Sequence, residues 1–454
     1  MDKTQGLGSK MRTALEGIQR VRDSAARDRN IVYTSLLHHA TLGLFRACYE
    51  ELNKNAAPGV DKRTWQEYGA SDLEAKLTGL RERVFSKTYR ALPAKRTYIP
   101  KGNGGKRPLG IPAIEDKIVQ NVVRHILDAV YEPRFKGFSY GFRTGRGCQE
   151  ALDALYVAIT ERKVSYVLDA DIKGYFDSIP HDALIGILEE RIKDSRIIRL
   201  IKIWLKAGIL EEGKVYRDEK GTPQGSVISP LLANIYLDYV LDQWTDEWRK
   251  RALGEVYIIR YADDFIICFQ YKSDASIYLR ALITRLGQYG LKQQEEKTRL
   301  LEFGRFAAEN RKRRGQAKPE TFDFLGFTHI CGKSLKGKFK LVRKTISKRL
   351  GAKVKEIGQK LRQMMHWELK DMLDALKRVL KGYYNYFAER DNMRCMISLR
   401  YVVGRRLIHI LRRRSQKARK VCTWDWFNKN VESYLPYPVA KEYPGVRFRR
   451  RLAG

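Results

Sequence analysis

The chain has 454 residues and a formal net charge of +36, from 88 Lys and Arg against 52 Asp and Glu. That length is enough for two or three domains with hydrophobic cores, and that charge predicts a polyanionic partner. No apolar run approaches the roughly 18 residues of a membrane span, and the N-terminus lacks the apolar core of a signal peptide. The six scattered cysteines argue against a disulfide framework or a zinc finger and indicate a cytoplasmic protein.

The positive charge is concentrated toward the C-terminus. Residues 311–454 carry 38 Lys and Arg against 11 Asp and Glu, whereas residues 1–310 carry 50 against 41. Charge this dense could form a solvated face, a membrane-surface patch or a nucleic-acid surface. Apolar residues at helical spacing, with aromatic residues among them, favour a folded nucleic-acid binder.

The first elements are helical. Residues 1–30 are polar and basic, and helical spacing of apolar residues predicts a helix from Ile31 to Leu52. The Pro58-Gly59 pair then marks a turn.

A pair of strands is expected over residues 96–112, with Asn103-Gly104 as the hairpin signal. Lys101 and Arg107 flank that turn. Both could reach a triphosphate, where cations stabilise developing charge. An isolated basic hairpin would instead be simply solvated.

An apolar strand from Tyr166 leads into Asp171, and the chain then turns through Gly174 into a helix. Tyr175 lies four residues after Asp171, where its ring could pack under a sugar and exclude a 2′-hydroxyl. The alternative is that Tyr175 is a core residue like Phe176. We favour the sugar contact for Tyr175 and the core for Phe176.

Residues 221–236 form a second distinctive block, which contains Pro223, Gln224 and Gly225 before a helix. Pro223 fixes a backbone dihedral, and Gly225 permits close approach of the backbone to a ligand. Gln224 can donate and accept hydrogen bonds at the edge of a base pair.

Two apolar runs between Val256 and Phe269 flank Ala262, Asp263 and Asp264, which predicts a β-hairpin with an acidic turn. Adjacent carboxylates in such a turn could simply favour the bend. Near buried strands, however, they need a compensating cation, and Mg²⁺ suits hard oxygen ligands. Asp171 from a separate strand end would complete a two-metal site for phosphoryl transfer.

After Gly332 the pattern is expected to become helical and basic. Apolar residues from Ile346 to Leu361 step by three or four and form one stripe among Lys and Arg. Further helices are expected over residues 369–380 and 397–411, before a basic and aromatic tail whose role the sequence does not reveal.

The segment Tyr261-Ala-Asp-Asp-Phe265, with Asp171 upstream, resembles the palm of a reverse transcriptase, and of the group II intron-encoded reverse transcriptase/maturases in particular. The blocks Ser139–Arg146, Gly221–Tyr236 and Phe324–Phe327 resemble that family in the same order. The resemblance implies an α+β right-hand polymerase with fingers, palm and an all-helical basic thumb. It implies an N-terminal extension (1–92), fingers and palm (93–330), a thumb/maturase domain (331–415) and a C-terminal tail (416–454).

The implied activity is RNA-directed DNA synthesis, in which dNTPs extend a primer on an RNA template, together with binding of intron RNA. Two Mg²⁺ would be held by Asp171, Asp263, Asp264 and the backbone carbonyl of Ile172. Two alternatives are an RNA-binding splicing cofactor with incidental polymerase activity and a defence-linked reverse transcriptase. A zinc-dependent endonuclease is not expected, because the tail contains only Cys422 and no clustered histidines.

The resemblance also implies roles for side chains at the matching positions. The dNTP would be bound by Lys101, Arg107, Tyr175, Gln224 and Lys297, and template phosphates by Arg143 and Arg146. The RNA-binding residues of the thumb would be Arg343, Lys344, Lys348, Arg349, Arg405, Arg406, Arg412, Arg413 and Arg414.

Overall fold

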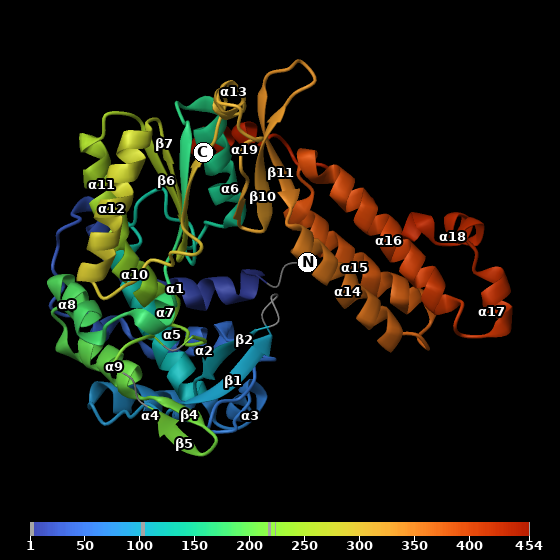
Figure 1. Ribbon diagram of the computed structural model, residues 1–454. Coiled ribbons are helices and arrows are strands. Elements are labelled where there is room, and N and C mark those ends of the chain that lie inside the picture. The colour runs from blue at the N-terminus through green and yellow to red at the C-terminus, as the bar shows by residue number, and fades with distance from the viewer. Residues whose placement is uncertain (1–3, 101–104, 217–218, 223, 454) are drawn as a thin grey trace.

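The structure, a computed structural model, describes residues 4–100, 105–216, 219–222 and 224–453. Figure 1 shows a body that holds the sheets, and a group of helices that projects from one side of it. The expected α+β architecture with a helical C-terminal region is confirmed.

The palm is an antiparallel sheet in the order β6-β7-β3-β8. Phe265 and Ile267 of β7 lie in one hydrophobic core, and Ile266 and Cys268 lie in a second core on the other face. Since successive side chains point to opposite faces, burial of both faces explains why these strands are almost wholly apolar. The strands are β3 (Tyr166–Asp171), β6 (Val256–Tyr261), β7 (Asp264–Phe269) and β8 (Arg299–Glu302).

The fingers contain a second sheet in the order β2-β1-β4-β5. The expected strand pair around residues 101–104 is present as β1 and β2, but the turn itself, with Lys101 and Asn103, lies outside the described residues. The strands are β1 (Ala94–Pro100), β2 (Lys106–Ile111), β4 (Ile209–Glu211) and β5 (Lys214–Tyr216).

The segment before the fingers is helical, but the helix expected from Ile31 to Leu52 is shorter. It begins only at Leu42, because the Thr41 side chain caps it by accepting a hydrogen bond from the Leu44 backbone N–H. The elements here are α1 (Thr4–Arg27), η1 (Leu37–His39), α2 (Leu42–Glu51), α3 (Trp65–Gly69) and α4 (Leu73–Phe85).

Further helices surround the palm sheet and connect it to the fingers (Figure 1). Among the described residues, no helix is both long and apolar enough to cross a membrane. The helices are α5 (Ile114–Tyr131), α6 (Cys148–Glu161), α7 (Tyr175–Ser178), α8 (His181–Arg191), α9 (Ser195–Lys206), α10 (Ser229–Leu237), η2 (Asp238–Asp242), α11 (Gln243–Trp248), η3 (Arg249–Arg251), α12 (Lys272–Gln288) and α13 (Ala307–Arg313).

A three-stranded sheet, in the order β11-β10-β9, joins the palm to the thumb. The expectation that the chain becomes helical directly after Gly332 is wrong, because β11 pairs along its whole length with β10, and helix begins only at Ser347. The strands are β9 (Phe322–Phe324), β10 (Phe327–Lys333) and β11 (Phe339–Thr345).

The thumb helices share their hydrophobic core with one face of the palm, since Leu361, Leu376 and Leu407 belong to the same cluster as Ile266. The last helix, α19, returns from the thumb and packs against α6 of the body (Figure 1). The elements are α14 (Ser347–Gln363), α15 (Leu369–Phe387), η4 (Arg390–Asn392), α16 (Met393–Leu411), α17 (Gln416–Val421), α18 (Trp424–Asn430), η5 (Glu432–Tyr434) and α19 (Pro444–Ala453).

Candidate functional site

The β6–β7 hairpin carries Asp263 in its turn. Tyr261 pairs with Asp264 across the hairpin, which leaves Ala262 and Asp263 as the two turn residues. Ala262 has φ +56°, a left-handed conformation that costs a non-glycine residue about 1–2 kcal/mol. The surrounding structure must therefore hold this turn in place.

The side chain of Arg260 stabilises this turn. Its fully buried side chain donates from Nη1 to the Ala262 carbonyl at 3.0 Å. Its Nε and Nη2 donate to the Asp242 carboxylate at 2.7 and 2.5 Å, and further bonds go to Asn234 and Ser139. The sequence alone did not single out Arg260, although a charged residue inside an apolar strand signals a buried partner.

Carboxylates gather at this end of the palm sheet. Asp171, the last residue of β3, stands directly opposite Asp264, the first residue of β7. Burial, followed by the negative charges of Asp169, Asp263 and Asp171, raises the pKa of Asp264 to about 7. Burial and the charge of Asp171 also raise the pKa of Asp263. These carboxylates therefore repel one another and favour a bound cation.

Lys297 and Arg107 bring positive charge to the same place. Lys297 Nζ lies 2.6 Å from Asp171 Oδ2. The charges of Arg107 and Lys297 both act to lower the pKa of Asp263, against the larger effect of burial. Lys297 thus contacts the carboxylate group, and the charge of Arg107 acts on it.

The donor set fits a hard divalent cation, which prefers carboxylate oxygens. The oxygens of Asp171, Asp263 and Asp264 do not all lie within 4.8 Å of one another, so a bound cation would draw them together. Ile172, whose carbonyl is the fourth expected ligand, follows β3 directly and bridges to Gln293.

Gln224 connects the fingers to the palm. Its backbone carbonyl accepts from the Gly110 N–H at 2.6 Å, and its side-chain Nε2 lies 3.3 Å from each carboxylate oxygen of Asp177. The side chain is half-buried and already engaged, so its contact with a base pair remains a prediction.

The sugar contact expected for Tyr175 does not fit its position, and Phe176 packs against the core as expected but is partly exposed. Tyr175 is buried and its hydroxyl donates to the Ala233 carbonyl at 2.5 Å, which places it in the core rather than against a sugar. Phe176 is only half-buried. The short helix α7 begins at Tyr175 and directs the first ring inward and the second toward the surface.

Arg143 does not fit the expected contact with template phosphates. Its side chain is buried, pairs with Glu132 at 2.7 Å, and donates to the carbonyls of Lys136 and Ser139. These bonds satisfy the guanidinium within the protein. Arg146 is exposed, and template binding by Arg146 remains a prediction.

The expected RNA-binding residues of the thumb differ in how far their side chains are exposed. Arg343 is buried and pairs with Glu389 at 2.6 Å, so its role is structural and the expectation is wrong. Arg414 is half-buried and donates to the Trp367 carbonyl. The exposed members are Lys344, Lys348, Arg349, Arg405, Arg406, Arg412 and Arg413.

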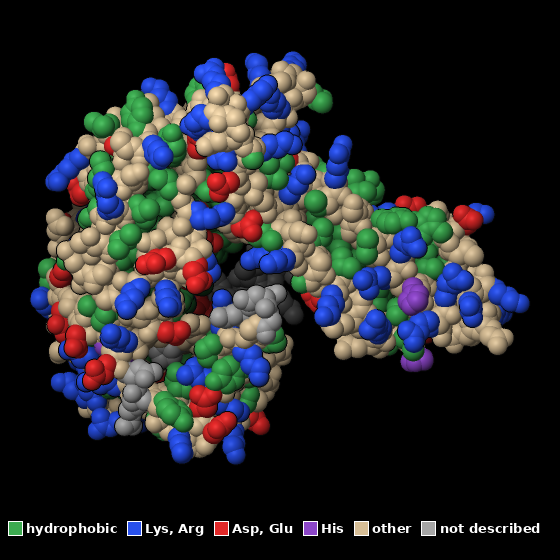
Figure 2. Space-filling model, in the orientation of Figure 1, with side chains coloured by type: hydrophobic (Ala, Val, Ile, Leu, Met, Phe, Trp, Pro, Cys, Tyr) green, Lys and Arg blue, Asp and Glu red, His purple; other side chains and the backbone are tan. Residues whose placement is uncertain are grey.

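Several of the exposed arginines line a hollow of about 910 Å³ on the thumb, which we call the thumb hollow. Its rings are in contact, because Tyr401 and Trp424 meet edge to face with centroids 5.2 Å apart. Figure 2 shows Lys, Arg and His side chains gathered over this end of the thumb. The lining residues are Tyr401, Arg405, Ile408, His409, Arg412, Arg413, Ser415, Gln416, Arg419 and Trp424.

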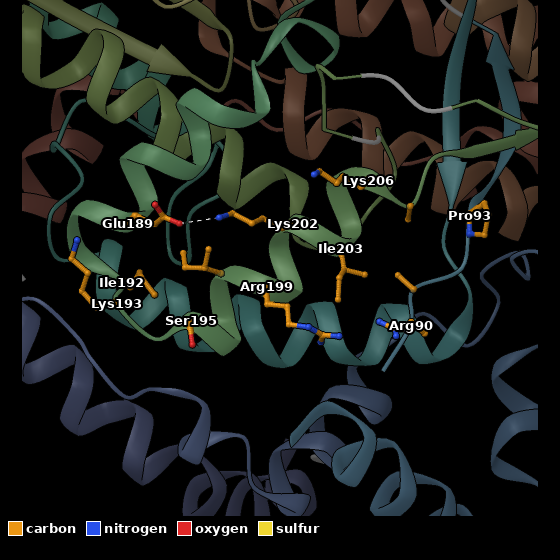
Figure 3. Close-up of a pocket in the computed structure, with 13 residues that line it drawn as sticks. Arg90, Pro93, Glu189, Ile192, Lys193, Ser195, Arg199, Lys202, Ile203 and Lys206 are labelled. Atoms are coloured by element: carbon orange, nitrogen blue, oxygen red, sulfur yellow. Dashed lines mark hydrogen bonds and ion pairs between the residues drawn. The ribbon is translucent and has the colours of Figure 1, made fainter. Parts of the chain in front are cut away.

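A second basic pocket of about 640 Å³, which we call the α9 groove, lies on the body (Figure 3). Its one acidic residue, Glu189, pairs with Lys202 at 3.1 Å. The other side is formed by the segment that leads into β1. The lining residues are Arg90, Ala91, Pro93, Glu189, Ile192, Lys193, Ser195, Ile198, Arg199, Lys202, Ile203, Lys206 and Ala207.

Cys48, Glu51 and His125 place possible ligand atoms within 4.8 Å of one another. Glu51 already accepts from Asn121 and lies 2.9 Å from the His125 ring. Burial raises the pKa of the Cys48 thiol well above its usual value, so it stays protonated. The Glu51 carboxylate is therefore already hydrogen-bonded, and the three residues run from the buried Cys48 to the exposed Glu51.

Two family models match this chain. The model described as reverse transcriptase (RNA-dependent DNA polymerase) matches residues 99–329, and the group II intron maturase-specific domain matches residues 347–429. The first match contains the carboxylates of the palm, and the second contains the thumb hollow.

Curated proteins are also similar. The group II intron-encoded protein LtrA of Lactococcus lactis subsp. cremoris is 35% identical over 229 residues, which is 50% of this chain and 38% of that protein. Protein YkfC of Escherichia coli is 35% identical over 238 residues, 46% of this chain and 61% of that protein. The chain thus matches less than two thirds of each relative's length. The solved telomerase of Candida albicans aligns with 82% of this chain and 69% of its own at 12% identity, and its TM-score of 0.43 is too low to add to the assignment.

Proposed function

We propose that this chain, which belongs to the reverse transcriptase (RNA-dependent DNA polymerase) family and carries a group II intron maturase-specific domain, extends a primer 3′ end with dNTPs on an RNA template. The observation that carries the proposal is the convergence of Asp171, Asp263 and Asp264 at one end of the palm sheet. Their mutual repulsion is what a divalent cation would relieve.

Two Mg²⁺ would be held by these three carboxylates and the Ile172 carbonyl. When bound, Mg²⁺ lowers the pKa of the primer 3′-hydroxyl and neutralises the leaving pyrophosphate. Lys297 pairs with Asp171 and the charge of Arg107 acts on Asp263, so both cations would bind the triphosphate and offset its charge.

A second role, binding of intron RNA, is supported by the maturase-specific domain and by the thumb hollow. In this hollow, arginines would bind phosphates and aromatic rings would stack on unpaired bases, a combination that suits a folded RNA. The α9 groove would bind phosphates of the same RNA on the opposite side of the molecule from the thumb. The unpaired cysteines suit a reducing compartment, so we infer that the protein works in the cytoplasm.

The test is primer extension with Asp263→Asn and Asp171→Asn, beside Asp182→Asn as an exposed-carboxylate control on α8. Both palm variants should lose extension by at least a hundredfold while RNA affinity stays within about twofold, because affinity comes from the basic surfaces. The control should behave as the unaltered protein. Extension by either palm variant within a few-fold of that protein would remove the metal assignment.

A further inference from the structure

A short segment of the fingers runs beside the catalytic hairpin. Ser139 forms a parallel bridge with Arg260 of β6. The Tyr140 N–H donates to the Arg260 carbonyl at 2.8 Å, and the Arg260 N–H donates to the Phe138 carbonyl at 2.9 Å. The chain therefore follows the edge of the palm sheet and brings Phe142 level with the turn that carries Asp263.

Both neighbours of Phe142 are fixed. A Cβ on Gly141 would lie 2.4 Å from the Ala262 backbone N, so the segment touches the catalytic turn directly. The Gly141 carbonyl accepts from Asn234 Nδ2 at 2.7 Å. On the other side, Arg143 is buried and bonded to Glu132. Phe142 is therefore held between two anchors that leave its backbone little freedom.

Phe142 itself is held in an unfavourable state. Its φ is +57°, a left-handed conformation that aromatic residues rarely adopt, and 55% of the residue is exposed. Its ring meets the half-buried Phe176 edge to face, with centroids 6.5 Å apart. A strained residue that its surroundings force into place is typical of a ligand-binding site.

We propose that Phe142 is a nucleotide-contacting residue of the polymerase site, and that its ring packs on the apolar face of a base or sugar beside the catalytic turn. This rests on the proposed function. The nucleotide comes either from the incoming dNTP or from the primer–template duplex, and both present the same flat, apolar surface to an aromatic ring. Such a contact explains why the anchors on either side present this ring to solvent.

The experiment compares Phe142→Gly, Phe142→Ala and Phe142→Tyr with the unaltered protein. Phe142→Gly removes the ring and also relieves the left-handed backbone, whereas Phe142→Ala removes the ring alone. Glu212→Gly is the matched control, because Glu212 has φ +49° in the β4–β5 turn, outside the palm. Single-nucleotide extension gives kcat and KM for dNTP, and fluorescence anisotropy gives Kd for an RNA–DNA duplex.

We expect Phe142→Gly and Phe142→Ala to raise either KM for dNTP or Kd for the duplex about tenfold. A change in KM alone identifies the incoming nucleotide, and a change in Kd identifies the duplex. Phe142→Tyr should stay within about twofold, and Phe142→Gly should melt no lower than the unaltered protein.

Two results would overturn the inference. One is that KM and Kd both stay within twofold in Phe142→Gly and Phe142→Ala. The other is that Phe142→Gly melts several degrees lower, since the ring would then be structural. If the unaltered protein extends no primer, the proposed function fails, while the Kd for the RNA–DNA duplex still tests whether Phe142 contacts a nucleotide.

Discussion

At the scale of single residues, the neighbouring aromatic residues Tyr175 and Phe176 differ in exposure. Tyr175 is closed into the core, where its hydroxyl has a carbonyl partner, and Phe176 is partly exposed and meets the exposed ring of Phe142. The backbone N–H of Thr222 donates to the Phe176 carbonyl at 2.7 Å, which ties Phe176 to the block that contains Gln224. Phe176, rather than Tyr175, is thus the ring that could exclude a 2′-hydroxyl.

We therefore predict that Phe176→Ala raises incorporation of rNTP relative to dNTP about tenfold, because removal of the ring opens space beside the sugar. The measurement is the ratio of kcat/KM for the two nucleotides in primer extension. Tyr175→Phe is the control, since it removes a buried hydrogen bond worth about 1 kcal/mol and leaves the surface unchanged. An unaltered ratio in Phe176→Ala, with extension retained, would refute the gate.

At the scale of elements, helix α19 connects the tail to both the palm and the thumb. Arg447 donates to buried Asp153 of α6 at 2.6 and 3.0 Å and to Glu389 at 3.1 Å. Arg343 of β11 joins the same Glu389. This buried network links α19 to α6, to β11 and to Glu389 after α15, so we infer that α19 helps to hold the thumb against the body.

We predict that Arg447→Ala destabilises the protein by about 3 kcal/mol, because it leaves buried carboxylates with fewer partners. Hydrogen exchange should become faster in α19 and β11. Arg450→Ala is the control on the same helix, since Arg450 pairs with Glu442 at the surface and such pairs contribute at most about 1 kcal/mol. Equal stability of the two variants would show that α19 does not hold the thumb.

At the scale of the whole molecule, the thumb cannot be treated as a separate unit. Its helices share one hydrophobic core with the palm, so removal of the C-terminal third would expose that core as well as remove charge. Figure 2 shows a hollow between the body and the thumb, and basic side chains over both. Substitutions that remove charge from one surface at a time are therefore the sharper test of RNA binding.

We predict that Arg405→Gln, Arg412→Gln and Arg413→Gln together lower RNA affinity. They should also make the slope of log K against log salt shallower by about 2, because each lost phosphate contact contributes about 0.7–0.9 to that slope. The matched set in the α9 groove is Arg90→Gln, Lys193→Gln and Lys206→Gln. Salt titrations of both sets measure the share of each surface. An unchanged slope in both would show that these cations are only solvated.

The sequence by itself predicted the palm strands and the carboxylates at their ends. Its strands are recognisable because both faces are buried, and Asp171, Asp263 and Asp264 stand out because charges at the ends of apolar strands need partners. The spacing of apolar residues among Lys and Arg likewise predicted that the thumb helices are basic and amphipathic. These features depend on the chemistry of neighbouring residues, which a sequence displays directly.

Only the tertiary structure decided which of the remaining charged and aromatic residues face a ligand. Arg143 and Arg343 are paired inside the protein, Arg260 holds the turn that carries Asp263, and Tyr175 is buried while Phe176 is partly exposed. Several partners lie far away in sequence: Glu389 is 46 residues from Arg343, and the Asp153 carboxylate that accepts from Arg447 is 294 residues upstream. Burial and pairing at such separations depend on how elements pack, so the local pattern of residues could not reveal them.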